Sequence, residues 1–148
     1  MDYDVVKKTM GEENSLVIGA LLPLTGKASS IGLGMQNAMF MALDDLQNDK
    51  LVLKFYDTKS SSEGAEQAIS QALSEGAELI LGPLMSEEVE SVADEALSAD
   101  IPVVSFTTSP QVLQKGIYSI GLLNGEQIDR AIAYASSKNR TKLGANFN

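Results

Sequence analysis

The sequence predicts an α/β protein, a doubly wound parallel sheet with helices on both faces. Apolar runs alternate with segments of helical periodicity, and short connections join them. The runs are continuously apolar, as in strands that are covered on both faces. The chain of 148 residues has the length of one domain, and such a domain buries about 70% of its unfolded surface.

Five apolar runs are the expected strands. They cover residues 16–22, 51–56, 78–81, 101–106 and, more weakly, 117–121. Pro102 is tolerable because it stands at the start of its strand. The strict alternation of these runs with helical segments indicates parallel pairing through helical crossovers.

Four helical patterns separate or follow the strands. The longest is rich in methionine, and we interpret its apolar stripe as core packing rather than a cofactor surface. The run 60–62 consists of serines that can cap the second helix, and Gly76 suits a left-handed cap at its end. The apolar stripes are Ile31, Met35, Ala38, Met39, Ala42, Leu43 and Leu46; Ala65, Ala68, Ile69, Ala72 and Leu73; Val89, Val92, Ala93, Ala96 and Leu97; and Ile128, Ala131, Ile132 and Ala135.

The composition narrows the range of functions. The net charge of −9 argues against binding to nucleic acid or to an anionic membrane. Cysteine and histidine are both absent, which removes disulfides, thiol nucleophiles, the usual general base and the commonest metal ligands. Catalysis by carboxylates or by Ser and Lys stays open, but we expect no catalytic residues, no metal site and no cofactor.

The ends of the chain differ from its middle. Residues 1–15 are polar and show no signal peptide. We expect them to be either a polar leading segment or extra residues placed ahead of a mature sequence. No apolar run reaches the roughly 20 residues that span a bilayer.

Four segments follow the expected strands and should meet at one edge of the sheet. They are residues 23–31, 57–62, 82–86 and 106–110, and they are rich in Ser, Thr and Gly. Ligands of doubly wound proteins bind at this carboxyl edge. At 80–86 the apolar run stops at Gly-Pro and a helix begins, which brings backbone N–H groups to the edge. The sequence thus predicts a binding site there.

Two motifs at this edge have simpler interpretations than the functional ones. Gly32-Leu33-Gly34 lacks the third glycine of a dinucleotide fingerprint because Asn37 stands there, so we expect close packing or approach to a ligand. Asp57 lacks the acidic pair of a receiver domain, and we interpret it as a hydrogen-bond acceptor that fixes a loop, with ligand binding as the alternative.

Hydroxyl groups are the remaining candidates. Ser86 lacks the flanking glycines of a nucleophile elbow and has no histidine to act as its base. We expect it to cap the third helix, a role that is compatible with ligand binding. Thr107, Thr108 and Ser109 form a second cluster, either of turn residues or of ligand contacts.

The order of motifs resembles a known family. The strings "VIGALLPLTGKASSIGLGMQNAMFMALDDL", "YDT", "GAELILGPLMSEEV", "IPVVSFTTSP" and "IYSIGLLNGEQIDRAIAYASS" are similar to the N-terminal lobe of type I periplasmic binding proteins. That superfamily includes the leucine/isoleucine/valine-binding proteins of ABC importers. Within that superfamily, the strings are most similar to those of the lipoproteins called penicillin-binding-protein activators. The resemblance covers residues 16–140.

The resemblance implies a non-enzymatic lobe that binds a small ligand. By position in the family motifs, Ser86, Thr107, Thr108 and Ser109 would contact the ligand, and Ile31 would line the pocket. Pro83, Glu87 and Phe106 depart from amino-acid binders, and an acidic group near a helix start repels a carboxylate. Residues 141–148 would be the truncated start of a second lobe, so we expect weak affinity from a half-cleft.

The resemblance also sets the alternatives for function. The protein would serve an amino-acid importer or activate a cell-wall synthase; alternatively, it is an interaction module that regulates a penicillin-binding protein and has a vestigial cleft. An enzyme is the least favoured alternative. The expected partners are a small molecule such as an amino acid or peptide-like compound, a membrane permease or a penicillin-binding protein, and a second copy through an uncovered face. The expected location is the periplasm, with a lipid anchor on the full-length precursor.

Overall fold

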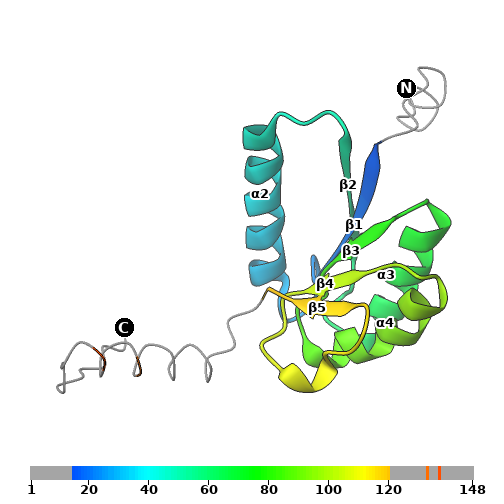
Figure 1. Ribbon diagram of the computed structural model, residues 1–148. Helices are drawn as coiled ribbons and strands as arrows, with labels where there is room; N and C mark the ends of the chain where they lie inside the picture. The colour runs from blue at the N-terminus through cyan, green and yellow to red at the C-terminus, as the bar shows by residue number, and fades with distance from the viewer. Residues whose placement is uncertain (1–14, 121–132, 134–136, 138–148) are drawn as a thin grey trace.

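The protein folds into a five-stranded, wholly parallel sheet with helices on both faces, as the computed structural model shows for residues 15–120 and positions 133 and 137 (Figure 1). This confirms the predicted α/β class. The strands are β1 (Leu16–Leu22), β2 (Leu51–Asp57), β3 (Leu79–Leu81), β4 (Val103–Ser105) and β5 (Ile117–Ser119). The helices are α2 (Ser29–Leu46), α3 (Ser62–Ser74), α4 (Ser86–Ser98) and the 3₁₀ turn η1 (Pro110–Val112).

The strand order β2-β1-β3-β4-β5 reverses direction once, beside β1. The chain leaves β1 for β2 through α2 and then crosses back to β3 through α3. These two right-handed crossovers run in opposite directions and therefore place α2 on one face of the sheet and α3 on the other, where α4 joins it (Figure 1). The reversal puts the carboxyl ends of β1 and β3 side by side, where doubly wound proteins bind ligands.

The core lies between the sheet and the pair α3 and α4. Small residues such as Ala65 and Ala68 let α3 approach the sheet closely, and larger residues fill the space beyond them. The apolar stripes predicted for these two helices are confirmed in nearly every position. The fully buried large apolar residues of this core cluster are Leu21, Ile69, Ile80, Val89, Val92 and Val103.

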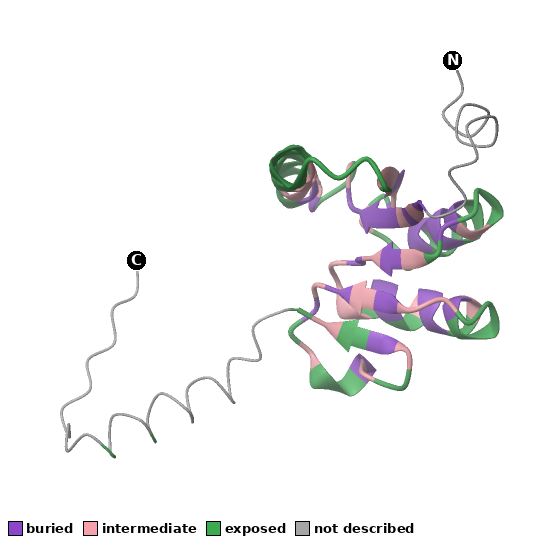
Figure 2. Ribbon diagram, turned by 45° about the horizontal axis from the view of Figure 1, so that its top comes forward, coloured by how far each residue is buried: buried purple, intermediate pink, exposed green. Residues whose placement is uncertain are grey.

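The opposite face is less well covered. Helix α2 rests on β2 through Phe40, whose ring centroid lies 4.8 Å from that of Phe55. Among the described residues α2 is the sole helix on this face, and most of it is exposed (Figure 2). The prediction that its apolar stripe fills the core is therefore wrong in part. Met35, Met39 and Leu43 are half-buried, whereas Ile31, Ala38, Ala42 and Leu46 are exposed.

Most element boundaries agree with the sequence prediction, but three strands are shorter than expected. The predicted strands at 78–81, 101–106 and 117–121 are each reduced to three residues. The fourth helical pattern and residues 1–14 and 141–148 lie outside the described residues, apart from Ala133 and Ser137, which are helical and exposed. In the described part of the chain, no helix has both the length and the apolar character needed to cross a membrane.

Candidate functional site

The four Ser-, Thr- and Gly-rich segments meet at the carboxyl edge of the sheet, because every strand points the same way. Side-chain hydrogen bonds connect each segment with its neighbour.

Asp57 connects the end of β2 to the loop after β1. Its Oδ1 accepts hydrogen bonds from the backbone N–H groups of Leu24 (2.9 Å), Thr25 (3.1 Å) and Lys59 (2.8 Å), and its Oδ2 accepts one from the Thr25 hydroxyl at 2.6 Å. Burial raises the pKa of Asp57, but these hydrogen bonds outweigh it and hold the pKa below the ordinary aspartate value. The loop-fixing role predicted for Asp57 is confirmed.

Serines add a second connection between the same loops. The Ser60 hydroxyl accepts a hydrogen bond from the backbone N–H of Ala28 (3.1 Å) and donates one to the carbonyl of Thr25 (2.8 Å). Ser61 caps α3 by accepting the N–H of Gly64 at 3.0 Å, as its place before the helix predicted.

A buried carboxylate connects the β2 loop to the start of α4. Glu88 is only 1% exposed. Its Oε1 accepts a hydrogen bond from the Thr58 hydroxyl at 2.7 Å, and its Oε2 accepts the Met85 N–H at 3.3 Å. Sequence reasoning missed Glu88, because an acidic residue in the first turn of a helix is usually solvated. The signal that was available is the capping position, three residues after the N-cap.

Ser86 and Thr107 connect α4 to the loop after β4. Their hydroxyl oxygens lie 2.8 Å apart, and Thr107 Oγ1 also accepts the Ser109 N–H at 3.1 Å. The prediction that Ser86 caps α4 is wrong: the helix begins at Ser86 itself, Met85 is the N-cap, and the Ser86 hydroxyl turns toward Thr107 instead.

These residues border a hollow of about 430 Å³ at the carboxyl edge, between the ends of β3 and β4. Of the predicted contacts, Ser86, Thr107 and Thr108 line it. Ser109 does not, although it is bonded to Thr107, and Ile31 lies elsewhere with 55% of its surface exposed. The full lining is Leu84, Met85, Ser86, Glu87, Phe106, Thr107 and Thr108.

Two glycines allow this edge to be compact. Gly82 has φ +106°, and a Cβ there would lie 2.2 Å from the Leu21 carbonyl oxygen; the peptide bond between Gly82 and Pro83 is cis. A Cβ on Gly32 would lie 2.0 Å from the Pro23 carbonyl oxygen, so close backbone approach explains the first glycine of the Gly32-Leu33-Gly34 motif.

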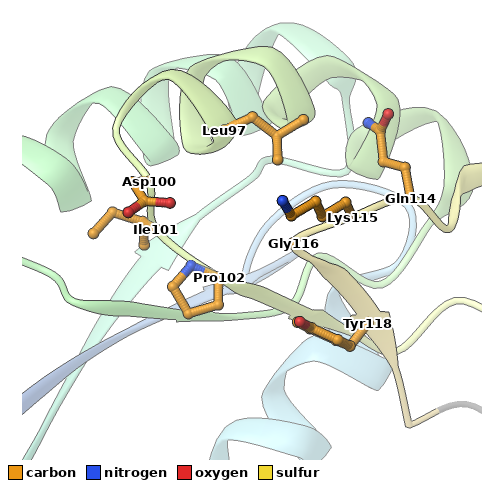
Figure 3. A pocket seen from close by; sticks show the side chains of 8 residues that line it. All are labelled: Leu97, Asp100, Ile101, Pro102, Gln114, Lys115, Gly116 and Tyr118. Carbon is orange, nitrogen blue, oxygen red and sulfur yellow. The ribbon is translucent and has the colours of Figure 1, made fainter.

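A second hollow, of about 530 Å³, lies at the opposite edge of the sheet, before β4 and β5. Figure 3 shows Leu97, Pro102 and Tyr118 around it, with Asp100 and Lys115 nearby. No pattern in the sequence indicated this second hollow. Although it is slightly larger, it lies away from the strand carboxyl ends at which doubly wound proteins bind ligands, so we take the carboxyl-edge hollow as the candidate site.

The candidate site can hold polar groups through hydroxyls and backbone N–H groups at the start of α4. Its apolar walls come from Leu84, Met85 and Phe106. In the described part of the chain, no three carboxylates are grouped as a metal site would require. The chemistry on offer is hydrogen bonding and apolar contact.

Comparison with known proteins gives a family and several similar folds. A family model described as "Periplasmic binding protein" matches residues 15–145. No curated protein sequence matches the chain. Similar solved structures include the leucine-binding protein LivK of Thermotoga maritima (24% identity, TM-score 0.69). Others are full-length LpoA of Haemophilus influenzae (24% identity, TM-score 0.69) and LivJ of Streptococcus pneumoniae in complex with isoleucine (17% identity, TM-score 0.66).

These structures are all much longer than this chain. The similarity covers 84% of this chain and 37% of LivK, 84% of this chain and 22% of LpoA, and 71% of this chain and 33% of LivJ. At identities below 25% the likeness is one of fold.

Proposed function

Because this chain belongs to the periplasmic binding protein family, we propose that it is a lobe that binds a small molecule at its carboxyl-edge hollow. The observation that carries the proposal is the pair of hydroxyls, Ser86 and Thr107, 2.8 Å apart at the ends of neighbouring strands and lining that hollow. Thr108 adds a third hydroxyl. Ser109 acts by orienting Thr107 through its backbone N–H, whereas Ile31 lies outside this hollow and has no part in the proposed site.

The proposed role is recognition without chemical change. The family consists of binding proteins, and the hollow offers hydroxyls and apolar walls. Since the hollow has walls from one lobe only, contact is one-sided and we expect dissociation constants in the millimolar range. In a longer protein the lobe would deliver its ligand to a membrane permease. We place it in the periplasm on the strength of its family, and a lipid anchor on a longer precursor is part of the same proposal.

Titration followed by NMR tests the binding function. Amino acids and their derivatives are added to the full chain, and we expect shifts confined to the amides of residues 84–87 and 106–108. Ser86→Ala should weaken binding severalfold, whereas Ser98→Ala, at the far end of the same helix, should leave it unchanged. Shifts spread over the whole surface, or none with any compound, would refute the proposed site.

The likeness to LpoA, together with the exposed apolar side chains of α2, favours a second candidate. Leu33, Phe40 and Met41 are 46%, 52% and 69% exposed, which is unusual for large apolar residues of one helix. In this alternative the lobe contacts a penicillin-binding protein and the hollow is vestigial. Co-sedimentation with a purified penicillin-binding protein at physiological salt tests it, and complete separation of the two proteins counts against it.

A further inference from the structure

The charge around the carboxyl-edge hollow is negative. Of the seven residues that line it, Glu87 is the one charged residue, and none is basic. Glu88 follows it in the first turn of α4, beneath the surface. A helix N-terminus carries about +0.5 of an elementary charge, which two carboxylates in the same turn outweigh.

Glu88 already accepts one of the backbone N–H groups at this turn. It accepts the Met85 N–H at one carboxylate oxygen and the Thr58 hydroxyl at the other. Because Glu88 is buried, salt and water screen a charge on it less than they screen a charge at the surface. An anion that arrives at this turn would therefore lie near a buried carboxyl group as well as near Glu87.

We propose that the hollow selects a ligand whose contacting group is a cationic amine, and that it discriminates against a carboxylate there. The inference rests on the proposed function, since it concerns the ligand of the same site. The Ser86 and Thr107 hydroxyl oxygens can accept hydrogen bonds from an ammonium group, while exposed Glu87 supplies the opposing charge at the mouth. The net charge of −9 acts in the same direction at longer range.

Three leucine derivatives that share one side chain test this proposal. Leucinamide is cationic, N-acetyl-leucinamide is neutral and N-acetyl-leucine is anionic at neutral pH. We titrate each into the full chain at low ionic strength and follow the amides of residues 84–87 and 106–108 by NMR. The expected affinities fall in that order, by about threefold for each unit of charge.

A matched pair of variants assigns the effect. Glu87→Gln should reduce the ratio of the affinity for the cationic derivative to that for the anionic derivative by about threefold, because the exposed carboxylate is lost. Glu90→Gln, an exposed change on the same helix outside the hollow, should leave the spread unchanged. Circular dichroism verifies that both variants fold.

The outcomes separate this inference from the proposed function. If no derivative shifts these amides, the proposed function itself fails. If the derivatives bind equally, or in any other order, the charge selectivity is wrong while binding at the hollow stands. If the order holds but Glu87→Gln leaves the spread intact, Glu87 does not select the ligand and the proposal is overturned.

Discussion

The hydroxyl oxygens of Ser86 and Thr107 lie 2.8 Å apart although 21 positions separate the residues in sequence. Their hydrogen bond joins the first residue of α4 to the loop that follows β4. Thr107 is 3% exposed, so water cannot readily replace its partners there. The position of the α4 start therefore depends on the loop of the neighbouring strand.

Removing the Thr107 hydroxyl should destabilise the protein. Thr107→Val keeps the shape of the side chain but leaves the Ser86 hydroxyl and the Ser109 N–H without this partner. We expect the free energy of unfolding to fall by about 1–2 kcal/mol, measured by urea denaturation. Thr108→Val is the matched control: its side chain is exposed, and the change should stay within about 0.5 kcal/mol. Equal losses in the two variants would contradict the role of the buried hydroxyl.

The Asp57 carboxylate should make the free energy of unfolding decrease as the pH becomes acidic. Its pKa is lowered in the folded protein, because the hydrogen bonds to Thr25, Lys59 and Leu24 outweigh the effect of burial. The stabilisation is thus present above the unfolded-state pKa of about 3.9 and is lost as the pH falls through the lower folded-state pKa. Asp57→Asn does not titrate, so this variant should lose less stability at acid pH; we call the acid part of the stability profile its acid limb.

Urea midpoints measured from neutral pH down to strongly acidic pH provide the test for Asp57. Asp94→Asn, an exposed change on α4, serves as the control and should retain the acid limb of the parent protein. An Asp57→Asn profile that follows the parent at every pH would show that the carboxylate makes no net contribution.

Two glycines two residues apart in α2 should respond in opposite ways to the same substitution. A Cβ on Gly34 meets nothing within 4 Å, so Gly34→Ala should stabilise the helix by about 0.5–1 kcal/mol. A Cβ on Gly32 would lie 2.0 Å from the Pro23 carbonyl oxygen, and Gly32→Ala should destabilise the protein by about 1–3 kcal/mol. Thermal unfolding measures both, and shifts of the same sign would refute the close contact at Gly32.

The exposed apolar surface of α2 predicts self-association through the less covered face of the sheet. Sedimentation velocity over a range of concentrations should show a shift from monomer to dimer, because burying Leu33 and Met41 removes apolar area from water. Met41→Glu should abolish that shift, whereas Gln67→Glu on the opposite face should not. A sedimentation coefficient independent of concentration would exclude this homodimer.

The fold class could be predicted because its signals are local. A continuously apolar run such as Leu16–Leu22 and the apolar periodicity of Ser62–Ser74 are properties of a few consecutive residues. The exposure of Ile31 and Ala38 on α2 could not be predicted in this way. Whether an apolar stripe is covered depends on what else packs on that face of the sheet. The sequence of one helix does not show which elements pack against it.

The candidate site was predictable to the extent that topology determines it. Parallel pairing brings the strand ends together, and the position of Asp57 at the end of a strand was sufficient to predict its loop-fixing role. The burial of Glu88 depends on Thr58, a residue of another loop, so the local pattern gave no sign of it. For Ser86, a boundary shift of one residue turned an expected cap into a tertiary contact.

Side-chain hydrogen bonds brace the loops at the carboxyl edge against one another. In the part of the chain that the structure describes, Asp57, Ser60, Glu88 and Thr107 bond these loops to one another. A molecule that docks there has few side chains to immobilise, so little of its binding energy is spent on ordering the protein. The affinity of the rim is accordingly limited by how much of the ligand it can surround. An apposed second surface would tighten binding by enclosure, while the rim itself kept its shape.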